Sequence, residues 1–82
     1  MSDLERAIEL DRVATVAWEK AEARLDHWEA EGDRALARKA AATAASARLR
    51  LLETREKVVV AMLEERIKLR QNRSKQYEHM EF

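Results

Sequence analysis

Apolar residues recur at alternating spacings of three and four along residues 4–28, which is the period of an amphipathic helix. One heptad position holds Leu4, Asp11, Trp18 and Leu25, and the other holds Ala7, Ala14, Ala21 and Trp28. Seven of these eight residues are apolar, so the pattern predicts one helix with a single buried stripe. Ser2 and Glu5 have the spacing of a capping box, which places the start of this helix at residue 3.

The seven-residue pattern loses its phase at Gly32, the only glycine of the chain. Glycine favours the left-handed position just past a helix end, and Asp33 is a good N-cap for a following helix. We therefore predict an all-α antiparallel helical hairpin in one domain, residues 1–82. Its helices span 3–31 and 34–78, joined by a turn at 32–33, and the longer second helix projects beyond the first. The alternative is one continuous rod, because a lone glycine costs a helix only about 1 kcal/mol.

The charge distribution favours the hairpin over the rod. Residues 1–32 contain nine acidic and four basic residues, whereas residues 33–62 contain three acidic and seven basic ones. An acidic helix followed by a basic one favours antiparallel pairing, in which residue i lies opposite residue 65 − i. The pairs predicted by this register are Asp26 with Lys39, Glu19 with Arg48 or Arg50, and Asp11 with Arg55.

The positions of large and small side chains agree with the same register. Residues 40–47 are all Ala, Ser or Thr, and in the hairpin they lie opposite Trp18, Ala21 and Leu25, with Trp28 nearer the turn. Large side chains that pack over small ones fill space without clashes, so both tryptophans are predicted to anchor the core. Two charged residues, Asp11 and Glu56, interrupt the predicted seam. Such residues lower stability and set alignment, so we expect Asp11 to face Arg55 and to hold the helices in register.

The second helix carries more apolar surface than one partner helix can cover. One row consists of Leu49, Leu52, Val59, Leu63 and Ile67, with Glu56 in one slot, and a second row consists of Leu51, Val58, Met62 and Leu69. Two adjacent stripes need a second partner. We therefore predict self-association into a four-helix bundle or coiled coil, most simply as a homodimer. The residues predicted to form the partner or oligomer interface are Leu51, Val58, Met62, Leu69, Tyr77, Met80 and Phe82.

The composition argues against an enzyme, a metal site or a bound cofactor. The chain has no cysteine, one glycine and two histidines, His27 and His79, neither of which has another histidine three or four residues away. A thiolate site and a glycine-rich phosphate loop are therefore excluded, and a helical di-metal site is not expected. The longest apolar run, residues 58–63, is six residues long and too short to span a bilayer, so we expect a cytoplasmic protein.

A basic segment near the end of the second helix indicates an alternative function, the binding of nucleic acid. Residues 66–75 contain five basic residues and no acidic one: Arg66, Lys68, Arg70, Arg73 and Lys75. A basic stripe of this kind binds phosphate groups. The sequence predicts a non-enzymatic interaction module, such as a chaperone-like adaptor, a regulatory protein or an inhibitor, which binds a partner protein through apolar helix surface. The alternative is a dimeric helical bundle that binds RNA or DNA. A structural role in a larger assembly is not separated from the first hypothesis by the sequence.

Overall fold

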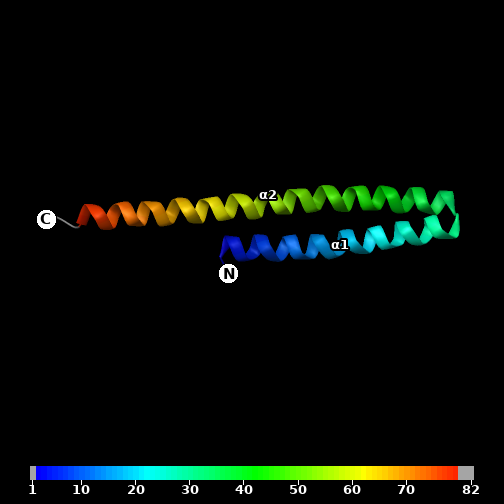
Figure 1. The fold of residues 1–82 in the computed structure, drawn as a ribbon, viewed down its shortest axis with the longest axis horizontal. Helices are drawn as coiled ribbons and strands as arrows, with labels where there is room; N and C mark the ends of the chain where they lie inside the picture. The colour runs from blue at the N-terminus through cyan, green and yellow to red at the C-terminus, as the bar shows by residue number, and fades with distance from the viewer. Residues whose placement is uncertain (1, 80–82) are drawn as a thin grey trace.

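The protein is an antiparallel hairpin of two long helices, as the computed structural model shows (Figure 1). The structure describes the backbone of residues 2–79 and the side chains of residues 2–73. Helix α1 spans Asp3–Glu31 and helix α2 spans Arg34–His79, one residue longer than expected. The Cα trace measures 76 × 17 × 14 Å, so the hairpin lies almost in one line. The predicted reversal is confirmed, and the alternative of a continuous rod is wrong.

Hydrogen bonds at the helix ends explain the sharp reversal. Gly32 has φ 74°, a left-handed conformation that favours glycine, and its amide donates to the carbonyl of Glu29. The amide of Asp33 donates to the carbonyl of Trp28, which completes a Schellman motif. The Asp33 carboxylate then accepts from the amide of Leu36 and caps α2. Asp33 therefore ends one helix with its backbone and begins the next with its side chain.

Ser2 caps the start of α1, which confirms the predicted helix start at residue 3. The Ser2 hydroxyl accepts a hydrogen bond from the amide of Glu5 at 3.1 Å, and the Ser2 carbonyl accepts from the amide of Arg6. Two acidic residues, Asp3 and Glu5, lie in the first turn, where negative charge is favourable beside the free amides of a helix N-terminus.

The core is a narrow seam between the two helices, built mainly from small side chains. On α1 it contains Ala7, Ala14 and Ala21, all buried, with Leu4, Asp11, Trp18, Leu25 and Trp28 half-buried between them. We call the α2 side of the seam the inner row; it consists of Ala37, Ala40, Ala44, Ala47, Leu51, Thr54, Val58 and Ala61. Alanine at alternate positions lets the two backbones approach closely along the whole seam.

A contact between Asp11 and Thr54 defines the register of the hairpin. The Thr54 hydroxyl lies 3.0 Å from Asp11 Oδ1, and Arg55 Nε lies 3.9 Å from the same oxygen. The same register sets buried Ala14 level with buried Leu51, and buried Ala21 level with buried Ala44. The predicted register, in which residue i faces residue 65 − i, is therefore confirmed, as is the expectation that Asp11 faces Arg55.

Helix α2 continues well past the start of α1 (Figure 1). In this register Asp3 lies level with Met62, so the 17 residues from 63 to 79 project by about 25 Å at 1.5 Å per residue. The inner row would continue through Glu65, Lys68 and Asn72, which are polar. Among the described side chains, the inner-row positions of the extension are therefore polar.

Candidate interaction surface

Helix α2 has a second apolar face on the side turned away from α1. We call it the outer row: Leu49, Leu52, Glu56, Val59, Leu63, Arg66 and Arg70, all exposed. These residues alternate in spacing between three and four and are offset by two residues from the inner row, so the two rows lie on nearly opposite sides of one helix. The apolar members are 49–64% exposed, and no part of α1 reaches them.

This arrangement corrects the predicted division of the α2 surface. Glu56 was expected in the seam between the helices, but it is exposed and belongs to the outer row. Leu51 and Val58 were expected to contact a partner, but they lie in the inner row and pack towards α1; Leu51 is only 3% exposed. The reason is helical phase, because a continuous helix that buries Ala40, Ala44 and Ala47 must turn Leu51 and Val58 to the same side.

The other predicted interface residues divide into an exposed group and a group whose side chains are not described. Met62 is 54% exposed and Leu69 is 62% exposed, and both flank the outer row. The backbone of Tyr77 belongs to α2, but its side chain lies outside the part of the chain that the structure describes. Met80 and Phe82 also lie outside the described residues. The sequence pattern identified the apolar residues of the outer row but predicted that they pack against α1, whereas they are exposed in the hairpin.

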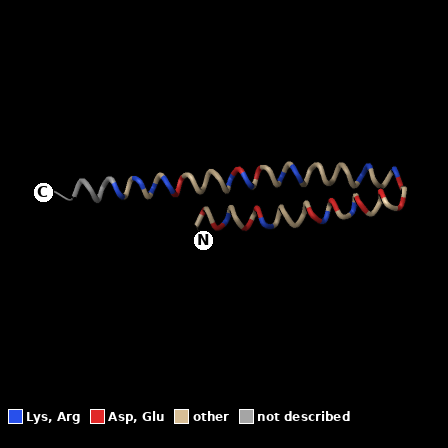
Figure 2. The backbone as a smooth tube through the Cα atoms, viewed as in Figure 1, with Lys and Arg blue, Asp and Glu red and all other residues tan. Residues whose placement is uncertain are grey.

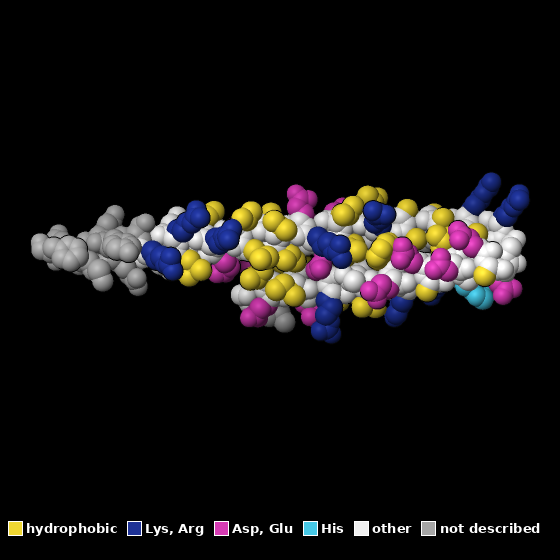
Figure 3. Space-filling model, viewed as in Figure 1, with side chains coloured by type: hydrophobic (Ala, Val, Ile, Leu, Met, Phe, Trp, Pro, Cys, Tyr) yellow, Lys and Arg dark blue, Asp and Glu magenta, His cyan; other side chains and the backbone are white. Residues whose placement is uncertain are grey.

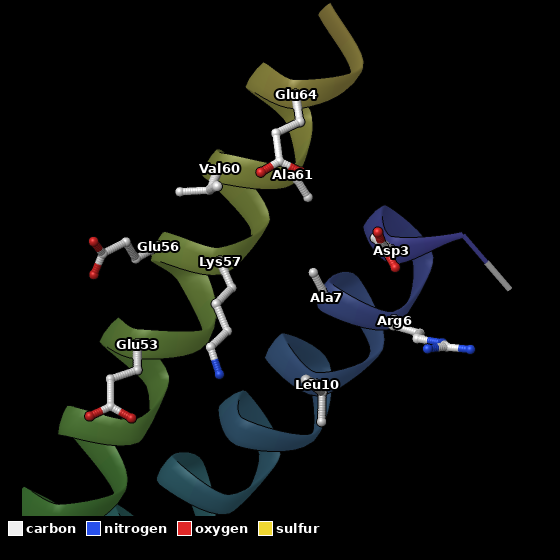
Figure 4. Close-up of a pocket in the computed structure, with 10 residues that line it drawn as sticks. All are labelled: Asp3, Arg6, Ala7, Leu10, Glu53, Glu56, Lys57, Val60, Ala61 and Glu64. Atoms are coloured by element: carbon white, nitrogen blue, oxygen red, sulfur yellow. The ribbon is translucent and has the colours of Figure 1, made fainter. Parts of the chain in front are cut away.

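Exposed apolar side chains gather where the beginning of α1 meets α2 (Figure 3). An open groove of about 540 Å³ separates the two helices here. Its apolar lining consists of Ala7, Leu10, Val60 and Ala61, and its charged rim consists of Asp3, Arg6, Glu53, Glu56, Lys57 and Glu64. Ala7 and Ala61 point towards each other across the groove, and the Lys57 side chain extends between the helices (Figure 4). The groove arises because two methyl groups are too small to fill the seam at this level.

Ion pairs contribute little to this surface. Within residues 2–73 the pair between Arg55 and Asp11 is the one ion pair that joins the two helices. The predicted pairs of Asp26 with Lys39 and of Glu19 with Arg48 or Arg50 do not form, which is expected of long exposed side chains that stay hydrated. Of the predicted pairs between the acidic and basic segments, only that of Asp11 with Arg55 therefore forms.

The predicted basic stripe lies on the extension of α2. Basic residues follow one another where α2 has passed the start of α1 (Figure 2). Arg66, Arg70 and Arg73 line a shallow depression together with Leu69, and Lys68 is exposed nearby. Lys75 continues the helix, but its side chain lies outside the described part. Three of the five predicted basic residues are thus brought to one side of the extension.

The histidines and acidic residues form no compact group in the described part of the chain. The His27 ring meets the Trp28 ring edge to face, with 4.8 Å between centroids. Among the described residues no three histidine or carboxylate side chains come close enough to share a metal ion. Neither described helix contains a stretch that is both long and apolar enough to cross a membrane.

Comparisons with known proteins give no information about the function of this chain. No protein-family model matches this chain, and neither a curated protein nor a solved structure is significantly similar to it. The functional argument therefore rests on the two faces of α2 and on the charges beside them.

Proposed function

We propose that this protein acts by binding rather than by catalysis, as a small helical adaptor or regulatory protein in the cytoplasm. Its outer row docks against a helix of another polypeptide chain. The hairpin supplies a rigid, elongated support, and α2 supplies the recognition surface. This mode corresponds to helix addition, in which two amphipathic helices bury their apolar stripes against each other.

The observation that carries the proposal is the exposed apolar spacing on the outer face of α2. Alternate spacings of three and four are the pattern of a helix that packs against another helix. α1 already occupies the opposite side of α2, so it cannot cover this row. Removing apolar surface from water is worth roughly 25 cal/mol per Å², and a row this long therefore favours association.

The test compares one charge substitution on the outer row with the same change elsewhere. Leu63→Glu places a carboxylate at an apolar position of the row, whereas Val16→Glu places one on an exposed position of α1. Self-association is measured by sedimentation velocity, and binding to other proteins by capture from an extract of the source cells. We expect Leu63→Glu to abolish both kinds of association and Val16→Glu to preserve them, with helicity by circular dichroism unchanged in both variants.

Two outcomes would contradict the proposal. One is a Leu63→Glu protein that associates as strongly as the unmodified chain. The other is equal loss of association in both variants, which would mean that added negative charge, rather than the outer row, controls binding.

A second candidate function, binding of RNA or DNA, is favoured by the depression between Arg66, Arg70 and Arg73. Guanidinium groups spaced along a helix match successive phosphates, and Leu69 beside them offers an apolar contact. Binding to duplex DNA and to structured RNA is measured as a function of salt concentration. This candidate predicts affinity that falls steeply with salt and is lost in Arg70→Glu. No binding at about 50 mM salt rejects it.

A further inference from the structure

We infer that the chain docking on the outer row is a second copy of this protein, which runs antiparallel with the twofold axis level with Ala61. This inference rests on the proposed function, because it takes the outer row as the docking surface and names its occupant. In this dimer the two α2 helices lie side by side at the centre, and each α1 lies on the far side of its own α2.

The spacing of the outer row defines which residues face each other. In an antiparallel pair with this axis, residue i lies opposite residue 122 − i of the second copy. Val59 then faces Leu63, and Glu56 faces Arg66, each pair occurring twice because the interface is isologous. Leu52 faces Arg70, whose aliphatic stem can cover the leucine while its charge reaches water.

Apolar side chains gather around the proposed axis. Val59 and Leu63 belong to the outer row, and Val60 and Met62 flank it on its two sides. Each of the four is about half exposed in the hairpin. The antiparallel arrangement brings both copies of all four together, and Val60 and Met62 each approach their own symmetry mates. Eight apolar side chains therefore occupy the centre of the interface, with charged residues only towards its ends.

Charge complementarity selects the second copy and its direction. Glu56 is the one acidic member of the outer row, and the basic members, Arg66 and Arg70, lie on the other side of the apolar centre. Antiparallel pairing puts each Glu56 opposite an arginine. Parallel pairing in register would put Glu56 against its own copy and each arginine against its own copy. Like charges placed directly opposite each other oppose association, so the row complements itself in one direction only.

The charges also select the register. Moving the axis by half a heptad towards the turn sets Glu56 opposite Val59 and brings the two Glu56 carboxylates towards each other. Moving it the same distance the other way sets Leu63 opposite Arg66 and Val59 opposite Arg70, so the apolar centre is lost. The axis at Ala61 is the register that pairs opposite charges and keeps the apolar residues together.

The dimer also accounts for the extension of α2. Residues 63–73 of one copy lie along residues 49–59 of the other. The apolar surface of the extension, Leu63 with Ile67 and Leu69 beside it, thus faces the partner, while its polar side, Glu65, Lys68 and Asn72, stays in water. This matches the polar composition of the extension on the side from which α1 is missing.

A charge exchange tests both direction and register. Glu56→Arg and Arg66→Glu each replace two attractive pairs by two repulsive ones in the homodimer. We expect each single variant to raise the dimer dissociation constant at least about tenfold, measured by sedimentation equilibrium at low salt. The double variant E56R/R66E restores both pairs and is expected to dimerise within about threefold of the unmodified chain. Glu64→Arg, the same charge change at a position of α2 outside the outer row, serves as the control and should have little effect.

The outcomes separate this inference from the proposed function. Single variants that dimerise normally, or a double variant that stays weak, overturn the antiparallel register. A chain that is monomeric at all concentrations overturns self-association, yet the proposed function survives if Leu63→Glu still abolishes capture of another protein. Disulfide formation gives an independent measure of direction. Leu52→Cys mixed with Arg70→Cys should cross-link while neither cross-links alone, whereas a parallel dimer would cross-link each variant with itself.

Discussion

Asp11 is the charged residue through which the two helices are aligned. Its carboxylate is half-buried and accepts from the Thr54 hydroxyl, with the Arg55 guanidinium 3.9 Å away. The pairing with Arg55 follows from the hairpin register and is predictable from the sequence. The contact with Thr54 is not, because it depends on which face of α2 is buried. Thr54 has a second acceptor, the carbonyl of Leu51 at 2.9 Å, so its hydroxyl does not depend on Asp11 alone.

Replacing Asp11 tests whether this charge serves alignment rather than stability. Asp11→Leu removes a half-buried charge and adds apolar contact, while Thr54 keeps the Leu51 carbonyl as acceptor. We expect the free energy of unfolding to rise by about 1 kcal/mol and the population to become less uniform in oligomeric state. Thermal unfolding followed by circular dichroism gives the first quantity, and sedimentation velocity gives the second. A variant that is less stable yet uniform would contradict this role, and Asp11→Asn, which keeps an acceptor, is the control.

Gly32 adopts its left-handed conformation for backbone reasons alone. A Cβ atom built on it would meet nothing within 4 Å, so no side-chain clash prevents substitution. Gly32→Ala is expected to lower the free energy of unfolding by about 1–2 kcal/mol, the cost of a left-handed conformation for an L-residue with a side chain. Urea unfolding measures it, with Gly32→Asn expected to cost less. An alanine variant as stable as the original chain would mean that the turn does not require this conformation.

At the level of the helices, the seam depends on small residues at regular intervals. Ala44 is buried opposite Ala21, whereas its neighbour Ala45 is exposed. Both residues are alanines in the middle of one helix, so they have the same intrinsic helix propensity. They form a matched pair for separating packing between the helices from propensity within one helix.

Ala44→Leu is expected to destabilise the hairpin by about 1–3 kcal/mol, because the added side chain forces apart two closely packed backbones. Ala45→Leu changes an exposed position and is expected to alter the free energy of unfolding by less than about 0.5 kcal/mol. Chemical denaturation of both variants provides the comparison. Equal effects at the two positions would show that the inner row is not the packing surface.

The helices themselves are largely predictable from the sequence, whereas the roles of their faces are not. The capping residues and the heptad pattern locate α1 and the turn, because each is a local feature of the chain. The division of α2 into inner and outer rows is different. Two rows of similar apolar content compete there, and the choice depends on how α2 leaves the turn and on which row contains the alanines that allow close approach.

For the whole molecule, shape distinguishes the hairpin from other arrangements in solution. The hairpin has a Cα radius of gyration of 20.8 Å, whereas a continuous helix of 82 residues would be about 120 Å long, with a radius of gyration of about 35 Å.

Small-angle scattering over a range of concentrations tests the hairpin and the proposed dimer together. We expect the forward scattering divided by protein concentration to double as the protein dimerises. The longest dimension is expected to increase only from 76 Å to about 85 Å, because the two extensions overlap. A radius of gyration near 35 Å at low concentration would contradict the hairpin. A doubled mass with a much longer particle would contradict overlap of the two extensions.

Local signals in the sequence determined the two helices, the turn at Gly32, the antiparallel register and the facing of Asp11 and Arg55. Each depends on residues close together in the chain or on a register that the turn imposes. Tertiary structure alone decided that Leu51, Thr54 and Val58 face α1 and that Leu49, Leu52, Glu56, Val59 and Leu63 face outward. The reason is that α2 buries the face whose small side chains let the backbone of α1 approach closely. Which face this is depends on the packing of the two helices and not on the sequence of α2 alone.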